Sequence, residues 1–442
     1  MASGTLRKII ALREALRALR NRNYRLFFIG QGISLTGIWM QTIAVGWLVY
    51  RLTRSELMLG IVTFSSQVPV FLLSPLAGVI GDRFDRRRIL LVMQFLALCQ
   101  ALTLAVLTIM GTVEVWQVLL LSVLLGLVNA FEMPARQAFV VELIDDRADL
   151  ANAIALNSAL FTGARLIGPA AAGILVATAG EGACFLANAA SYPASLAALF
   201  MMTIPRRDAE GERKKLLGDL KEGMRYAFGF PPIRALLAAV ALLSLTAMSF
   251  PVLLPVFASD ILHGGPNTYG FLVAASGFGA IWGTLYLAMQ KSVLGLDRVI
   301  SASLVLFGLG LGAFSLSRSA VLSMAILAIV GFGMILAMAA CNTILQTIVE
   351  EGMRTRVMGL YVMVFMGAAP LGSITAGGVS TAIGAPATIL IAGALCVIGG
   401  LLFARWVPVL RRLVRPIYHK MGIIKEVAMG IQTTEELTTP PE

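Results

Sequence analysis

Charged residues are sparse in this 442-residue chain, so those inside its apolar stretches are the first candidates for chemistry. One apolar stretch contains four polar residues spaced by 7, 3 and 4 positions, namely Ser122, Asn129, Glu132 and Arg136. These spacings place all four side chains on one face of a helix. A carboxyl group at membrane depth can bind and release a proton, and a nearby arginine tunes its proton affinity. We therefore predict that Glu132 binds an exchangeable proton and that Arg136 and Arg165 tune its affinity.

A simpler interpretation of the same residues stays open. Glu132 and Arg136 are four residues apart and can form a permanent ion pair that holds the inner end of their helix. At 1.5 Å per residue, a helix that begins near Trp116 reaches Glu132 after roughly 24 Å, toward the far side of a bilayer. Arg165 lies about 20 Å into the next helix, where it can pack against a neighbour or bind a charge on a substrate.

Composition indicates the surroundings of these residues. Hydrophobic residues make up 58% of the chain and charged residues 13%, with a mean hydropathy of +0.85. A soluble domain carries about a quarter charged residues, so most of this surface must face lipid. The net charge of +11 then indicates basic loops against anionic lipid rather than a nucleic-acid site. The four cysteines fall in apolar runs without paired spacing, which predicts neither disulfides nor a metal site.

Twelve apolar stretches are long enough to cross a bilayer, which requires about 20 helical residues. They run over 24–50, 57–80, 89–111, 115–139, 153–178, 183–204, 233–259, 269–290, 299–317, 320–348, 357–383 and 387–408. With both termini in the cytoplasm, the outer loops hold only Arg51, Arg54 and Arg318 of the 35 basic residues. Because basic loops stay inside, this is the orientation that we predict.

The long polar segment 205–232 divides the stretches into six and six. An acidic pair followed by a basic turn occurs at 145–147 and again at 350–354, which indicates a duplicated unit. The predicted fold is an all-α integral membrane protein with twelve transmembrane helices in two pseudo-symmetric six-helix bundles. Its predicted parts are an amphipathic cytoplasmic segment (1–23), the N-terminal bundle (24–204), a cytoplasmic loop (205–232), the C-terminal bundle (233–408) and a cytoplasmic tail (409–442).

The loop after the second stretch combines a glycine, an acid and several arginines: Gly78, Asp82, Arg83, Arg86 and Arg87. Gly78 allows two helices to approach closely, and Asp82 can face the positive N-terminal end of the eleventh helix. Arg83 or Arg86 can pair with a carboxylate such as Glu142. We predict a charge latch that holds the cytoplasmic ends of the two halves together. The alternative is a basic cluster that only fixes the topology.

This loop resembles the signature between helices 2 and 3 of the major facilitator superfamily, with Asp85 where the family usually has glycine. Asn129-Ala-Phe-Glu132-Met-Pro134-Ala-Arg136, together with Arg356-Val-Met-Gly359-Leu-Tyr361, resembles the enterobactin-exporter and macrolide-efflux branch. The resemblance extends from about residue 20 to about residue 410. It implies a proton-coupled exporter of hydrophobic or amphiphilic small molecules, of drug or siderophore type, that works by alternating access in a bacterial cytoplasmic membrane.

The resemblance also implies roles for other residues. Gly168, Pro169 and Gly173 resemble the antiporter motif of helix 5, although its upstream glycines are mostly missing, and Ser122 stands where many drug antiporters have arginine. Helices 1, 4, 7 and 10 line the pathway in this family. The expected cavity residues are Gln31, Ser34, Gln41, Asn129, Met334, Met338 and Asn342. These uncharged, polarizable side chains suit varied apolar ligands, and ordinary helix packing is an equal alternative.

The predicted partners are a small-molecule substrate, protons and membrane lipids, with no nucleic acid, cofactor or metal, and the protein is expected to act as a monomer. The only histidines are His263 in an outer loop and His419 in the tail, and no phosphate-binding Gly-x-x-x-x-Gly-Lys motif is present. These features argue against an enzyme. A lipid or lysolipid flippase, a metabolite importer, and a membrane enzyme or sensor are the alternatives.

Overall fold

The structure is a computed structural model that describes residues 16–144, 147–203, 216–290 and 292–421. Within α3, the side chains of residues 74–75 and 78–83 are not described. All the regular elements of the described residues are helices. In chain order these are η1 (Arg17–Arg20), α2 (Arg22–Thr53), α3 (Glu56–Arg83), α4 (Arg86–Ile109), α5 (Val115–Glu142), α6 (Arg147–Ala179), α7 (Glu181–Met201), α8 (Leu216–Gly229), α9 (Pro231–Ala247), α10 (Ser249–Val256), η2 (Phe257–Ile261), α11 (Pro266–Met289), α12 (Leu296–Leu316), α13 (Ala320–Ile348), α14 (Glu351–Ile383) and α15 (Ala385–Lys420).

Twelve helical spans in the described part of the chain are long and apolar enough to cross a membrane. Each corresponds to one predicted stretch, and α9, α10 and the π-helical turn η2 together form the seventh. The predicted fold class is therefore confirmed, and the protein is a multi-pass membrane protein. The hydropathy of the sequence indicates these helices because lipid offers no hydrogen bonds, so every backbone polar group of a span must be paired within its helix.

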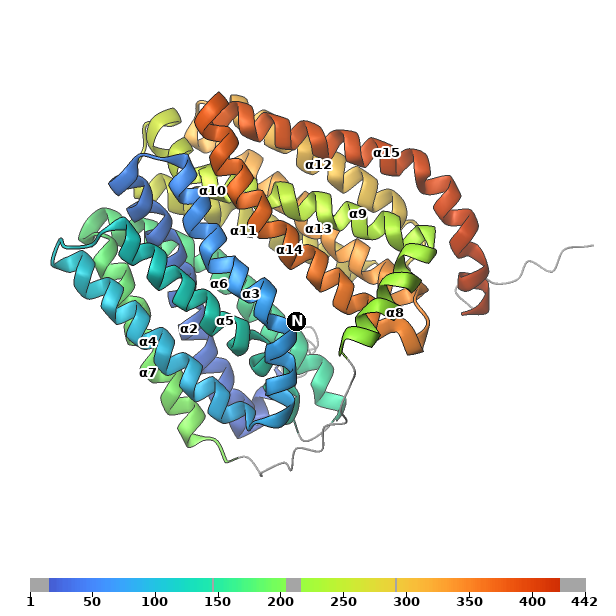
Figure 1. Cartoon of the computed structure of the whole chain (residues 1–442), viewed down its shortest axis with the longest axis horizontal. Helices are drawn as coiled ribbons and strands as arrows, with labels where there is room; N and C mark the ends of the chain where they lie inside the picture. Colours follow the sequence, from blue (N-terminus) through green and yellow to red (C-terminus); the bar gives the residue numbers. More distant parts are fainter. Residues whose placement is uncertain (1–15, 145–146, 204–215, 291, 422–442) are drawn as a thin grey trace, which may run out of the picture.

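The helices form two bundles, one of α2–α7 and one of α9–α15 (Figure 1). The bundles contact each other mainly through two helix pairs, α3 with α14 and α6 with α11. In Figure 1, α3 and α14 lie together at one end and diverge toward the end that carries α8. The bundles therefore meet at the predicted outer end and spread apart at the predicted inner end.

Two tight turns show the relation between the halves at the level of the backbone. Gly180 joins α6 to α7 with φ +80° and ψ 171°, and Gly384 joins α14 to α15 with φ +84° and ψ 157°. A positive φ favours glycine, since a side chain would be strained there. The same single-glycine turn thus connects the fifth span to the sixth and the eleventh to the twelfth.

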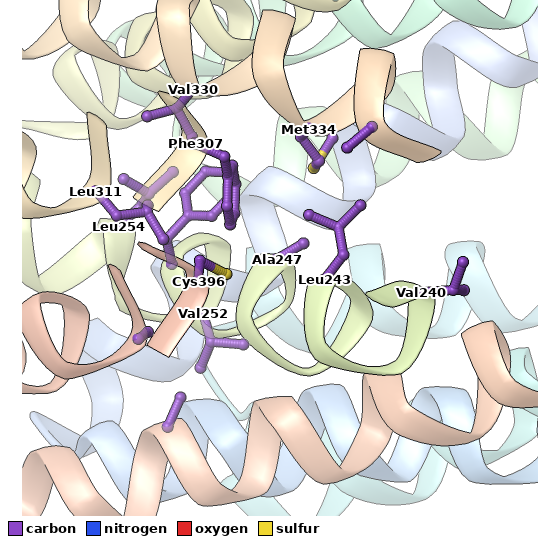
Figure 2. Packing of buried hydrophobic residues seen from close by; sticks show 14 of the residues in the cluster. Val240, Leu243, Ala247, Val252, Leu254, Phe307, Leu311, Val330, Met334 and Cys396 are labelled. Carbon is purple, nitrogen blue, oxygen red and sulfur yellow. The ribbon is translucent and has the colours of Figure 1, made fainter. Parts of the chain in front are cut away.

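The interior of the C-terminal bundle is apolar. Figure 2 shows Leu243 and Ala247 of α9 beside Phe307 and Leu311 of α12 and Met334 of α13. Lipid tails are as apolar as these side chains, so the helices associate through close packing rather than through exclusion of water. These side chains pack the helices of the C-terminal bundle against one another.

Two segments differ from the sequence prediction. Helix α8 occupies 216–229, inside the segment predicted as a loop, and its apolar residues Leu217, Leu220, Met224 and Ala227 recur at helical spacing. Helix α15 continues to Lys420, beyond the predicted end at 408, even though Pro408 and Pro416 lie within it. The five-part division stays a prediction at its edges, because residues 1–15, 204–215 and 422–442 lie outside the described residues.

Candidate functional site

Glu132 and Arg136 form an ion pair inside the N-terminal bundle. The Glu132 Oε1 and Arg136 Nη1 atoms are 3.7 Å apart on consecutive turns of α5, and the two side chains are 4% and 15% exposed. A charge held in so little solvent needs compensation, and Arg136 provides it. The predicted proximity of this pair is therefore present in the structure.

Three neighbouring helices complete the surroundings of this pair. The Arg136 Nη1 donates to Gln31 Oε1 of α2 at 3.3 Å, and Tyr192 of α7 lies within electrostatic reach of both charged groups. The fully buried amide of Gln94, on α4, faces Glu132. No other described residue hydrogen-bonds to the Gln94 amide, so the amide is available to Glu132. Leaving a buried amide unpaired costs about 1–3 kcal/mol, so a hydrogen bond between Gln94 and Glu132 is energetically favoured.

A chain of amides continues from this site toward the predicted outer end. Gln41 Nε2 donates to Gln100 Oε1 at 3.0 Å, and Asn188 Nδ2 donates to Gln41 Oε1 at 2.7 Å. A Cβ on Gly37 would lie 2.6 Å from Asn188 Oδ1, so glycine is what lets α2 and α7 come this close. All the buried amides of the described residues lie in the N-terminal bundle, whereas the buried polar side chains of the C-terminal bundle are serines, threonines and Asp297.

The residues predicted to line a substrate cavity lie within their own halves. Gln31, Ser34 and Gln41 are buried, and the described hydrogen bonds of the two glutamines go to α4, α5 and α7. Asn129, Met338 and Asn342 are partly buried, and Met334 is packed into the C-terminal core (Figure 2). Among the described residues no hydrogen bond joins the two sets. Their assignment to the substrate pathway stays a prediction.

Arg165 lies at the junction of the halves and not beside Glu132. Its guanidinium is 5.8 Å from the ring centroid of Trp39 on α2, and the Trp39 ring meets Phe161 edge-on at 6.0 Å. A Cβ on Gly277 of α11 would lie 3.1 Å from the Arg165 carbonyl oxygen. The structure describes no acidic partner for this arginine. It is a cation with one aromatic neighbour, Trp39, at the contact between α2, α6 and α11.

The contacts between the halves depend on glycine. A Cβ on Gly270 of α11 would lie 2.4 Å from the Pro169 carbonyl oxygen and 2.8 Å from the Cα of Gly173 on α6. At the other helix pair, a Cβ on Gly377 of α14 would lie 2.6 Å from the Glu56 carbonyl oxygen and 3.1 Å from the Cα of Gly60. The backbones therefore touch. Each pair has the small residues that allow close helix approach in membranes.

The helix 5 motif of the sequence lies at these contacts. Pro169 and Gly173 face α11, as described above, and a Cβ on Gly168 would lie 2.6 Å from the Trp39 Cβ of α2. The motif thus brings α6 close to the opposite half and to the first helix.

A polar cluster joins the halves at the predicted outer end, and we call its three residues Tyr50, Arg54 and Asp260 the outer latch. The Tyr50 hydroxyl donates to Asp260 in a short hydrogen bond. The Arg54 Nη1 lies 3.4 Å from Asp260 Oδ1 and donates to the Ser259 hydroxyl at 3.1 Å. The latch connects the end of α2 to η2. The sequence does not indicate this latch, because its residues are some 200 positions apart and no local pattern connects them.

The charge cluster predicted at the inner end is only partly described. Arg86 Nη1 and Glu142 Oε1 form an ion pair at 2.6 Å between α4 and α5, and Arg87 donates to the Phe200 carbonyl at 3.0 Å. These contacts lie within the N-terminal half. Gly78, Asp82 and Arg83 occupy the last turns of α3, and their side chains lie outside the described residues.

Twelve spans in two bundles that meet through α3–α14 and α6–α11 are the architecture of a membrane transporter of the major facilitator type. A family model described as transmembrane secretion effector matches residues 14–412, and the chain belongs to that family. The family consists of transporters and not enzymes, so the cargo is a small molecule.

Curated relatives cover most of the chain. The staphyloferrin A transporter of Staphylococcus aureus is 27% identical over 79% of this chain and 87% of its own length. The multidrug efflux pump Tap of Mycolicibacterium fortuitum is 26% identical over 82% and 88%. The enterobactin exporter EntS of Citrobacter koseri is 24% identical over 89% and 94%.

Solved structures share the fold. A bacterial homologue of the human lysosomal transporter Spinster, in an inward-facing and occupied conformation, has a TM-score of 0.69 at 14% identity and covers 90% of this chain and 98% of that chain. A bacterial homologue of ferroportin in an inward-facing state has a TM-score of 0.66 at 16% identity over 87% and 98%. At this identity the likeness shows the fold alone.

Two adjacent glycines of α14 allow a matched test of the contact between the halves. The Gly377→Ala variant places a methyl group 2.6 Å from the Glu56 carbonyl, whereas in Gly378→Ala the nearest atom is 3.9 Å away. An overpacked contact costs about 1–3 kcal/mol, so the first variant should raise the outer-open population roughly fivefold or more. The second should not.

The distance between spin labels at Thr112→Cys and Ser319→Cys, one on each half and both exposed, measures this population when Cys99 is replaced by serine. Equal distance distributions in Gly377→Ala and Gly378→Ala would contradict a glycine-dependent contact.

Proposed function

We propose that the protein is a proton-coupled exporter of amphiphilic small molecules that works by alternating access. The observation that carries the proposal is the buried carboxyl group of Glu132, which has the Arg136 cation beside it and the buried Gln94 amide facing it. Such a group can exist in two protonation states. Arg136 and the amide N–H of Gln94 can stabilise the carboxylate, and the amide oxygen of Gln94 can accept a hydrogen bond from the neutral acid. A site with a single satisfied state would favour a permanent ion pair instead.

The chemistry of the two states follows from the neighbours. As a carboxylate, Glu132 attracts Arg136 across 3.7 Å. As a neutral acid, it loses that attraction, and its O–H can donate to the Gln94 Oε1. Arg136 then keeps its hydrogen bond to Gln31 and no longer has an anionic partner in Glu132. Protonation would thus change the contacts among α2, α4 and α5, which are helices of a single half.

The outer latch suits a contact that opens and closes repeatedly. The Arg54 and Asp260 side chains are 65% and 49% exposed. An exposed ion pair contributes about 0–1 kcal/mol, and the hydrogen bond of the buried Tyr50 to the Asp260 carboxylate adds about 1.5–3 kcal/mol, so the latch can be broken and remade at moderate cost. The halves can then rock about the glycine contacts, as expected for transporters built from two repeats.

The substrate class follows from Arg165 and from the relatives. A guanidinium over the Trp39 ring at the junction of the halves can bind an anionic group and stack against a flat ring. The relatives include two siderophore transporters and several drug efflux pumps. We therefore propose export of drug-like or siderophore-like molecules, with Arg165 as the partner of an anionic group.

The proposed orientation places both termini in the cytoplasm of a bacterial cell, with the protein acting as a monomer in the cytoplasmic membrane. This orientation is supported by the unequal distribution of basic residues between the two ends of the spans. Arg51, Arg54 and Arg318 are at one end, while the segments 83–88 and 405–415 carry a cluster of arginines at the other. In this orientation the end at which α3 and α14 diverge faces the cytoplasm.

The Glu132→Gln variant tests proton coupling. It removes the titrating group and keeps its size, so substrate-driven proton flux in proteoliposomes should fall at least tenfold, while Glu114→Gln, at the exposed start of the same helix, should behave as wild type. The assay uses whichever member of a panel of cationic dyes and carboxylate or catechol chelators the wild type transports. An unchanged ratio of protons to substrate, with only a lower melting temperature, would assign Glu132 to a structural ion pair.

The Arg165→Gln variant tests the substrate contact. Transport and binding of an anionic chelator should fall at least tenfold, because the variant loses its charge, while a cationic dye should change less than threefold. Arg165→Lys should restore part of the anionic binding. Equal losses for both classes of substrate would indicate that Arg165 only packs α6 against α2.

A further inference from the structure

A cavity of about 290 Å³ lies between α12 and α15 at the predicted inner end, away from the contact between the halves. Its lining combines two arginines and a serine with three apolar residues: Arg298, Ser301, Ala404, Val407, Pro408 and Arg411. The proton site and the outer latch use none of these residues. The cavity therefore calls for a separate explanation.

The two arginines of the cavity differ in their environment. Arg411 is oriented by the buried Asp297, to which its Nη2 donates at 2.7 Å in addition to a short bond from Nε. Arg298 is exposed, and the structure describes no hydrogen bond or ion pair for its guanidinium. Asp297 offsets one charge, so the cavity keeps an excess cation that is free to bind an anion.

The surroundings strengthen this attraction. Arg412 and Arg415 are exposed and continue the cavity face of α15 by one turn, and the structure describes no partner for either guanidinium. Arg298 is also in the first turn of α12, where the helix dipole favours negative charge. Several independent positive groups converge at the boundary where the span leaves the membrane.

The apolar half of the lining indicates what kind of anion fits. Ala404, Val407 and Pro408 share one face of α15, and Leu401 and Leu402 follow them, exposed, toward the membrane centre. A soluble anion needs no such surface, whereas an acyl chain does. Basic pockets between helices at this depth suit the head groups of acidic lipids.

We propose that this cavity binds an anionic phospholipid of the inner leaflet. The phosphate lies between Arg298 and Arg411, the glycerol region meets Ser301, and one acyl chain runs along Ala404 and Leu401. The lipid would fasten the inner end of α15 to α12, next to the Asp297–Arg411 pair. The inference goes beyond the export proposal and depends on neither the cargo nor the proton site.

The test is binding of a short-chain lipid to the purified full-length protein in neutral detergent. Dioctanoyl phosphatidylglycerol should bind and raise the melting temperature, while dioctanoyl phosphatidylcholine and inorganic phosphate at the same concentrations should not. Native mass spectrometry counts the bound lipid. The Arg298→Gln variant should weaken phosphatidylglycerol binding at least fivefold. Arg234→Gln serves as the matched control, because Arg234 is an exposed arginine at the same end of the molecule.

Each other outcome overturns the proposal. Equal losses in Arg298→Gln and Arg234→Gln would indicate general attraction to a basic surface. Stabilisation by inorganic phosphate alone would indicate a site for soluble anions. Equal binding of phosphatidylcholine would show that binding does not depend on the net charge of the lipid. Because the readout is binding, a failure here is separate from any failure of transport.

Discussion

The halves of this transporter touch where glycine removes the side chains between them. A Cβ on Gly60, Gly270 or Gly377 would lie within 2.4–2.7 Å of a carbonyl oxygen in the opposite half. The attraction between backbones in such close contact acts only at short range, so a small tilt of the helices weakens it. The latch of Tyr50, Arg54 and Asp260 adds a buried hydrogen bond and an exposed ion pair at the same end. The molecule is therefore held closed at one end by packing that a small rotation can release.

The two bundles share a backbone plan and differ in their interiors. The single-glycine turns at Gly180 and Gly384 have nearly the same conformation, as expected of a duplicated unit. The N-terminal interior holds a buried ion pair and a chain of amides, and the C-terminal interior is packed with aliphatic and aromatic side chains. A buried network with a titratable group changes its hydrogen bonds when that group gains or loses a proton, whereas close-packed apolar side chains do not respond to protons. This asymmetry suits a division of labour in which one half responds to protons.

Sequence predicted the spans, the class of fold and the local ion pair Glu132–Arg136, because hydropathy and helical spacing determine them. It also named Arg86, beside Arg83, as a possible partner of Glu142, and the structure shows the Arg86–Glu142 pair. It did not predict Gln94 or Tyr192 as neighbours of Glu132, nor the latch at Asp260. Such contacts depend on how each helix is rotated in its bundle, and a polar face alone does not say which neighbour it meets. For the same reason Gln31 and Gln41 face the bundle interior and Arg165 lies apart from Glu132.

The account depends on one motion, in which the outer end opens as the inner end closes. Spin-label distances across both ends of the same protein test it most directly, with one pair at Thr112 and Ser319 and a second at Phe84 and Glu351, all exposed. Between pH 8 and pH 5.5 in lipid nanodiscs, the account predicts that the outer distance and the inner distance change in opposite directions. Two distances that stay fixed, or that lengthen together, would contradict it.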